Sequence, residues 1–216
     1  MGKLTKIIED PLMGYVIEAK GLFEKYLQTR LPMTHITKKR YSAEDTKAAE
    51  EYALDIFAQA HLDTDFLVSH GSIKKDDPMK TQKIEFSTMD GGLKEITEGK
   101  HSEDSSVFKI PWGEIDWDAN AFRMGKVWIG RSPNVAIQLV HKNVSKTHGY
   151  LKTKGGRVYY ADVGSTNGSK VGGKMIQNPL EDIAVESGNI INIGGVKLTF
   201  YSAQGFYQDV LNNLKS

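Results

Sequence analysis

Three clusters of small polar and basic residues stand close together in the second half of the chain. They are Ile-Gly-Arg-Ser at 129–132, Val-Ser-Lys-Thr-His-Gly at 144–149 and Asp-Val-Gly-Ser-Thr-Asn-Gly at 162–168. Such residues supply fixed positive charge and several hydrogen-bond donors, which are what a phosphate group needs. The clusters therefore predict the binding of an anion.

Four side chains carry most of this prediction. Arg131 has a permanent charge with planar paired donors, and Lys146 adds a second cation. Ser145 offers a hydroxyl donor and Asn167 an amide donor. The glycine-rich turn at 164–168 would also let backbone N–H groups point at the ligand. We expect a phosphate monoester to fit these donors.

The elements that must position the clusters read as β-strands. From residue 107 onward, short apolar or alternating runs are separated by turns rich in Gly, Asn and Asp. The predicted strands cover 107–110, 121–124, 127–129, 136–139, 149–153, 158–161, 190–193 and 196–201. This spacing is typical of an antiparallel sandwich, whose loops would present the clusters at one end.

The first half has helical spacing instead. Apolar residues between 4 and 31 recur at three- and four-residue steps, with a break near Pro11, and a second helix with Ser42 as its N-cap carries apolar residues at 48, 49, 52, 53, 56 and 57. The stretch 71–105 is polar, with a short strand expected at 83–86. A last helix is expected after residue 202.

These patterns predict an α+β protein in which a helical N-terminal module precedes an antiparallel β-sandwich. The expected divisions are a helical module at 1–70, a polar linker at 71–105, a sandwich at 106–202 and a C-terminal helix at 203–216. The chain of 216 residues is long enough for a real core in either one or two domains.

Composition excludes several classes of protein. With Cys 0, the chain has no disulfides, thiolate zinc sites or cysteine nucleophiles. It contains no apolar run long enough for a membrane span, and Glu9 and Asp10 interrupt the N-terminus before a secretory signal could form. We therefore expect a cytoplasmic protein without membrane insertion. Its histidines show no metal-ligand spacing, so no metal or other cofactor is expected.

Charge is divided unevenly along the chain. Residues 1–105 carry 19 acidic against 15 basic residues, and residues 106–216 carry 8 against 13. The second half should favour an anionic ligand, but its bias is too small for nucleic-acid binding. An acidic N-terminal region beside a cationic pocket could also compete for it. Phosphorylated Thr81, Thr88 or Thr97 would then be a ligand within the same chain, although unmodified loop threonines are the simpler reading.

The three clusters, in their order and spacing, resemble the motifs of the forkhead-associated (FHA) domain. Gly130-Arg131, then Ser145 to His148, then Ser165 to Gly168 match its loops, and Ile137-Gln138-Leu139 matches a strand of that family. The resemblance covers residues 107–201. It implies a two-sheet sandwich of about eleven strands that binds a phosphothreonine peptide from a partner in a Ser/Thr kinase pathway, without catalysis.

The resemblance also implies individual roles. Arg131 and Ser145 would bind the phosphate, with Lys146 adding charge; Asn167 would bind the peptide backbone, Thr166 would shape the pocket, and Asn143 would contact a flanking side chain. His148 would organise the loops rather than touch the ligand, with Gly130 and Gly168 shaping their backbone. Lys146 departs from the family pattern, because Arg or Asn is common there.

Other readings remain open at this point. The fold could serve as a scaffold or assembly subunit through a phosphate-independent surface. An enzyme could lie within 1–105, where Asp63 and Asp65 flank a loop near His61. Residues 168–175 nearly spell a phosphate-binding loop of nucleotide hydrolases, but Met175 stands where Ser or Thr should bind magnesium. The partner, the kinase and the oligomeric state cannot be read from the sequence.

Overall fold

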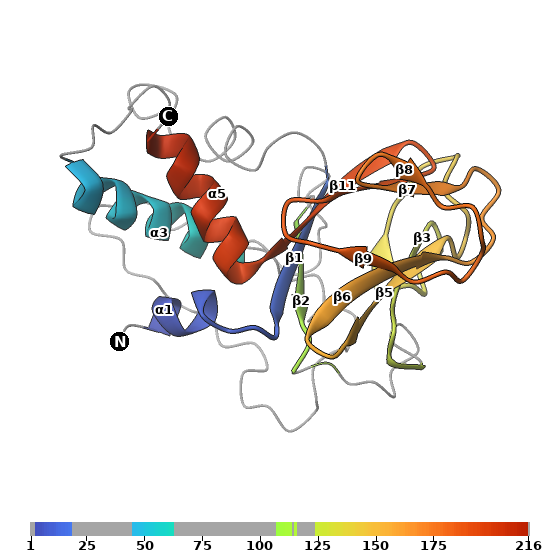
Figure 1. The fold of residues 1–216 in the computed structure, drawn as a ribbon, viewed down its shortest axis with the longest axis horizontal. Coiled ribbons are helices and arrows are strands. Elements are labelled where there is room, and N and C mark those ends of the chain that lie inside the picture. The colour runs from blue at the N-terminus through green and yellow to red at the C-terminus, as the bar shows by residue number, and fades with distance from the viewer. Residues whose placement is uncertain (1–2, 19–44, 63–106, 114, 116–123, 216) are drawn as a thin grey trace.

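The computed structural model describes residues 3–18, 45–62, 107–113, 115 and 124–215. Two β-sheets pack face to face, and helices cover the outer side of one of them (Figure 1). The described part of the chain forms eleven strands and three helices. The architecture is therefore a β-sandwich with a helical layer added to it.

The larger sheet has six strands in the order β2-β1-β11-β10-β7-β8. Its strands are β1 (Met13–Glu18), β2 (Val107–Pro111), β7 (Ser169–Val171), β8 (Lys174–Met175), β10 (Ile190–Ile193) and β11 (Val196–Ser202). All five pairs of neighbouring strands in this sheet are antiparallel. The sheet thus joins strands from both ends of the chain.

The smaller sheet has five strands in the order β4-β3-β5-β6-β9. Its strands are β3 (Val127–Gly130), β4 (Ile137–Gln138), β5 (Gly149–Lys154), β6 (Arg157–Asp162) and β9 (Ile183–Val185). The pair β3–β4 is parallel, and the other pairs are antiparallel. The prediction of a purely antiparallel sandwich is wrong at this pair, because the chain crosses over between β3 and β4 instead of making a hairpin.

Between the sheets lies a core of buried aliphatic and aromatic side chains contributed by both layers. Val16, Ile129, Leu151, Ile193 and Leu198 are each no more than 1% exposed and belong to it. Burial of such side chains is the main favourable contribution to folding. The core holds the strand ends in place, and the loops that leave those ends inherit their positions.

The helical layer covers the outer face of β1 and β11. It consists of α1 (Lys3–Ile8), α3 (Thr46–Leu62) and α5 (Ala203–Lys215). Tyr15 on β1, Phe57 on α3 and Phe206 on α5 are fully buried and meet edge to face, with ring centroids 5.2 to 5.7 Å apart. Edge-to-face packing suits the quadrupoles of aromatic rings. A second core therefore forms behind the sandwich.

The structure confirms two of the predicted helices and replaces part of a third with a strand. The C-terminal helix is confirmed, with Phe206, Val210, Leu211 and Leu214 buried, and the helix expected after Ser42 is present as α3. The helical pattern expected between residues 4 and 31, with a break near Pro11, is wrong at β1, because the chain is a strand there that pairs with both β2 and β11. The sandwich therefore includes a strand from the N-terminal segment.

The strand predictions have mixed outcomes. Those beginning at residues 107, 127, 149, 158, 190 and 196 are confirmed, while the strand expected at 136–139 is present only as the two residues of β4. Of the strand expected at 121–124, residues 121–123 lie outside the described residues. Met124 has a positive φ of 64° and stands before β3 in a short turn, so the prediction is wrong at that residue. The linker strand at 83–86 and Thr81, Thr88 and Thr97 lie outside the described residues. The domain boundaries stay predictions.

Candidate anion-binding site

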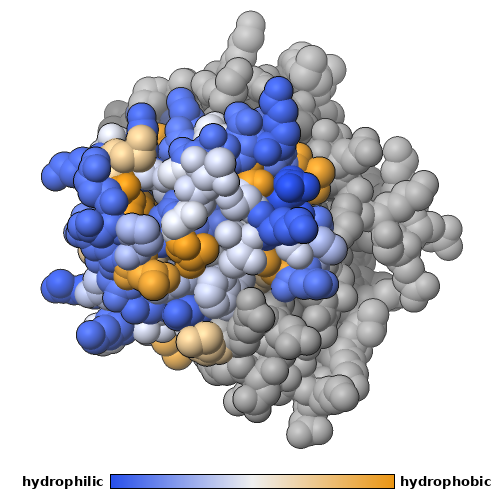
Figure 2. Space-filling view, turned by 90° about the vertical axis from the view of Figure 1, so that its right-hand side faces the viewer, coloured by the Kyte–Doolittle hydropathy of each residue, from blue (hydrophilic) through white to orange (hydrophobic). Residues whose placement is uncertain are grey.

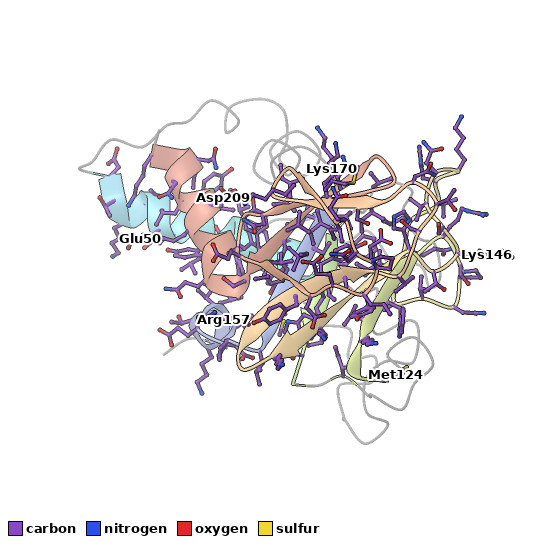
Figure 3. The ribbon with its side chains drawn as sticks, turned by 45° about the vertical axis from the view of Figure 1, so that its right-hand side comes forward. Glu50, Met124, Lys146, Arg157, Lys170 and Asp209 are labelled. Atoms are coloured by element: carbon purple, nitrogen blue, oxygen red, sulfur yellow. The ribbon has the colours of Figure 1, made fainter. Side chains whose placement is uncertain are left out.

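The three predicted clusters lie in loops at one end of the sandwich. The loops follow β3, precede β5 and connect β6 to β7, and the turn between β10 and β11 joins them. Lys146 marks this end and points away from Glu50 on α3 and Asp209 on α5 (Figure 3). The side of the molecule seen in Figure 2 is mostly hydrophilic, with small separate hydrophobic patches.

Arg131 and Ser145 are brought together by the backbone. The N–H of Arg131 donates to the carbonyl of Ser145 at 2.9 Å, and the N–H of Ser132 donates to the carbonyl of Lys146 at 3.0 Å. Gly130 permits this approach, because any side chain there would collide with the carbonyl oxygen of Lys146. Two loops that are distant in sequence therefore place their phosphate-binding candidates side by side.

The guanidinium of Arg131 is oriented and accessible. Its Nε donates to the carbonyl of Val144 at 3.2 Å, while the side chain as a whole is exposed. No carboxylate of the described residues forms an ion pair with Arg131 or Lys146, although Lys47 pairs with Glu51 and Lys152 with Asp182 elsewhere in the described residues. The remaining guanidinium donors and the Lys146 ammonium are therefore left for a ligand.

His148 sits beneath these loops and is fully buried. Its Nδ1 accepts a hydrogen bond of 3.0 Å from the N–H of Ser145, so the proton of a neutral ring lies on Nε2, which is 3.2 Å from the carbonyl oxygen of Gly168. Burial lowers the pKa of His148, although the Gly168 carbonyl and Asp162 act in the opposite direction. The neutral ring thus joins two loops without reaching the surface.

Asp162 organises the loop between β6 and β7. One oxygen, Oδ1, accepts from the N–H groups of Gly164 and Ser165 at 2.9 and 2.7 Å, and Oδ2 accepts from the hydroxyls of Ser165 and Ser169 at 2.7 and 2.5 Å. Burial raises the pKa of Asp162, but these hydrogen bonds outweigh it and hold the pKa below its usual range. The carboxylate is therefore charged, and each of its two oxygens accepts two hydrogen bonds from the protein.

The loop that Asp162 shapes presents Thr166 and Asn167 to solvent. The N–H of Thr166 donates to Ser145 Oγ at 3.3 Å, and Asn167 Nδ2 donates to the backbone carbonyl of Asn143 at 2.8 Å. The hydroxyl proton of Ser145 and the Oδ1 of Asn167 are not used in these bonds. Both groups can therefore meet a ligand at the surface.

Every predicted site residue lies in this loop cluster, but some act through their backbone. The carbonyl of Gly168 accepts from the N–H of Gly194 at 3.2 Å, and the contact from Asn143 to Asn167 uses the Asn143 carbonyl. Sequence reasoning gave no role to Asp162 or Gly194. The sequence Asp162-Val163-Gly164-Ser165 could have predicted the loop-organising role of Asp162, because Asp often accepts hydrogen bonds from the N–H groups two and three residues later.

Other expected or excluded chemistries can be compared with the structure. The near match to a nucleotide-binding loop forms the hairpin of β7 and β8, without the helix that such a loop needs. Within the described ranges, no group of three or more His, Asp or Glu side chains could hold a metal ion. Likewise, no helix in the described part of the chain is both long and apolar enough to cross a membrane.

Comparison with known proteins identifies the region. Residues 127–194 match the family model described as FHA domain, and the N-terminal part is unassigned. No curated protein matches the chain. Similar solved structures include the FhaA FHA domain in complex with an intracellular domain (27% identity, 36% of this chain and 81% of that chain, TM-score 0.32). A second is the FHA domain of CT664 from Chlamydia trachomatis (23% identity, 35% of this chain and 75% of that chain, TM-score 0.32). A third is the N-terminal FHA domain of S. cerevisiae Rad53p with a phosphothreonine peptide (20% identity, 40% of this chain and 77% of that chain, TM-score 0.34).

Proposed function

We propose that the FHA domain of this chain binds a phosphothreonine-containing segment of a protein that a Ser/Thr kinase has modified. FHA domains are a family of phosphothreonine-binding modules. The proposal assigns the phosphate to Arg131, Ser145 and Lys146, and the peptide backbone to Asn167. Thr166 would line the pocket beside the threonine methyl group.

One observation carries this proposal, namely the pairing of Arg131 with Ser145 across two loops. A phosphate group carries about −1.5 to −2 charge and three acceptor oxygens. Arg131 offers a fixed cation with donors besides its Nε, Ser145 a hydroxyl proton, and Lys146 a second cation that pairs with no carboxylate in the described part of the chain. These donors and positive charges suit the negative charge and the acceptor oxygens of a phosphate monoester.

The arrangement favours binding over catalysis. His148 and Asp162, the titratable residues closest beneath the site, are buried, and both ring nitrogens and both carboxylate oxygens already bond to loop atoms. A general base must reach the proton that it removes, and these groups do not reach the surface. We therefore assign them to positioning the loops.

A peptide screen tests the proposal directly. Full-length protein would be titrated with a library of phosphothreonine peptides, each alongside its unphosphorylated copy. We expect binding that requires the phosphate and that is lost in Arg131→Ala, with unchanged thermal unfolding because Arg131 is exposed. If no peptide binds in a phosphate-dependent manner, or if Arg131→Ala binds as tightly as the original, the phosphate assignment is wrong and a phosphate-independent scaffold becomes the better account.

A further inference from the structure

A hollow of about 320 Å³ opens at the side of the sandwich, where β8 ends one sheet and β9 ends the other. Its walls are Val171, Lys174, Met175, Ile176, Gln177, Asn178, Glu181 and Ile183. Four of these eight side chains are aliphatic or thioether groups. The hollow exists because β8 and β9 have a neighbouring strand on one side only, so the sandwich core reaches solvent between them.

The hollow lies beside the loop that carries part of the proposed phosphothreonine site. The sulfur of Met175 lies against Gly168, 3.5 Å from the position of a side chain there, and the N–H of Ile176 donates to the carbonyl of Ser169 at 3.0 Å. The N–H of Leu180 donates to the carbonyl of Asp162 at 2.6 Å. The loop that carries Thr166 and Asn167 therefore has Ser145 on one side and the hollow on the other.

The apolar walls of the hollow range from buried to exposed. Val171 is 5% exposed, Ile176 and Ile183 are half-buried against the sandwich core, and Met175 is 47% exposed. Nearby Leu180 is 60% exposed and holds a left-handed φ of 66°, which is strained for a branched side chain. The exposed polar residues Gln177 and Asn178 also line the hollow.

We propose that this hollow receives one apolar side chain of the same phosphothreonine peptide and so determines which peptides the domain selects. The proposal rests on the proposed function. A bound peptide that passes Asn167 and continues beyond Gly168 crosses Met175 and reaches the hollow. Lys174 and Glu181 at its edge carry opposite charges, which favours a neutral occupant over an acidic or basic one.

The spacing of the occupant follows from strand geometry. Val171, at the inner wall, lies four residues from Asn167, and because the chain turns at Gly168 and is extended only over β7, the two residues are at most about 14 Å apart. An extended peptide spans that distance in about four residues. The apolar side chain is therefore expected within about four positions of the phosphothreonine, on the side of the peptide that leaves toward β8.

A leucine scan tests this inference. The probe is a phosphothreonine peptide with a background of alanine, glycine and serine, and a single leucine is placed at each of the five positions before and after the phosphothreonine. Full-length protein is titrated with each peptide by fluorescence polarisation. We expect one position to improve affinity about fivefold to tenfold, which corresponds to about 1 to 1.4 kcal/mol. Met175→Ser should remove most of that gain, and it should fold normally because Met175 is half exposed.

Met124→Ser is the matched control, because Met124 is also exposed but lies on another side of the sandwich from β7 (Figure 3). It should leave the leucine gain unchanged. Phosphate-dependent binding without any leucine preference, or with a preference that survives Met175→Ser, would overturn the assignment of the hollow and leave the phosphate site intact. Absence of phosphate-dependent binding for every peptide would overturn both. Leucine-dependent binding without phosphate would instead indicate a separate partner for the hollow.

Discussion

The side-chain amide of Asn167 donates a hydrogen bond of 2.8 Å to the backbone carbonyl of Asn143, 24 positions earlier in the sequence. This bond ties the loop before β5 to the loop before β7. Because it uses one Nδ2 proton, it fixes the plane of the amide and leaves Oδ1 directed elsewhere. Asn167 is therefore held in place before a ligand arrives, which lowers the entropic cost of binding.

Replacing Asn167 with aspartate should strongly weaken phosphopeptide binding. Asn167→Asp places a carboxylate oxygen, which only accepts, against the Asn143 carbonyl, and it adds negative charge near the phosphate. Loss of such a hydrogen bond costs about 1 to 3 kcal/mol, or roughly fivefold to 150-fold in Kd by calorimetry. Asn143→Ala keeps the backbone carbonyl and therefore this bond, so it should lose less affinity, limited to the expected contact of its side chain with a flanking residue of the peptide. An equal loss in both variants would show that the Asn143 side chain, not the bond, matters.

Arg131→Lys should recover only part of the affinity that Arg131→Ala loses. Lysine keeps the charge but lacks the planar pair of donors and the Nε contact to the Val144 carbonyl. A hydrogen bond to a charged group contributes about 1.5 to 3 kcal/mol. Lys146→Ala should have a smaller effect that fades at high salt, because Lys146 is exposed. Titrations at two salt concentrations measure both effects, and full affinity in Arg131→Lys would contradict paired donation to the phosphate.

Phosphothreonine should bind more tightly than phosphoserine in the same peptide. Burial of the extra methyl group contributes on the order of 0.8 kcal/mol, and a glutamate in its place should bind poorly because it has fewer charges and acceptors. Competition between the three peptides gives the ranking. Equal affinity for phosphoserine would mean that Thr166 and its neighbours form no methyl pocket.

Acid should destabilise the protein through His148. Because the pKa of His148 is lowered in the folded state, the unfolded chain binds the proton first. The stability that depends on neutral His148 is complete above the ordinary pKa of about 6.5 and is lost as the pH falls from there toward the lower folded value. Asp162 does not contribute in that window, since its pKa lies below its usual range.

Urea unfolding between pH 7.5 and pH 5 measures this effect. Protonation of His148 Nδ1 would also break its bond from the Ser145 N–H, so phosphopeptide affinity should fall over the same range. His148→Gln should be less stable at neutral pH and should show a flatter pH dependence. A wild-type profile identical in shape to that of the variant would remove His148 as the cause.

Phe206→Ala should lower stability without altering the affinity of folded protein. Phe206 is fully buried between Tyr15 and Phe57, and truncation of a buried Phe costs about 3 to 5 kcal/mol. The helical layer lies at the end of the molecule away from Lys146 (Figure 3). Thermal unfolding and peptide titration of the remaining folded protein test the two parts, and a changed Kd would indicate that the layers are coupled.

The strand β1 shows why part of the fold could not be predicted from the sequence. Val16 faces the sandwich core, whereas Tyr15 and Ile17 face the helical layer, and all three are buried. A strand buried on both faces lacks the alternation that marks a half-exposed strand, so its apolar run is compatible with a helix. Only its pairing with β2 and β11 decides that β1 is a strand. Residues 19–106 separate β1 from β2 in the sequence, so this pairing has no local signal.

The sequence by itself determined the residue types of the site and the loops that carry them. Strands such as β5 and β6 can be predicted locally, because their apolar runs are bounded by clear turn residues. The tertiary structure decided how those loops meet. Gly130 lets the backbone of Lys146 approach, and the bond from His148 to Gly168 joins residues 20 positions apart. Such contacts depend on which strands become neighbours, and that choice is made by burial of the shared core rather than by any local pattern.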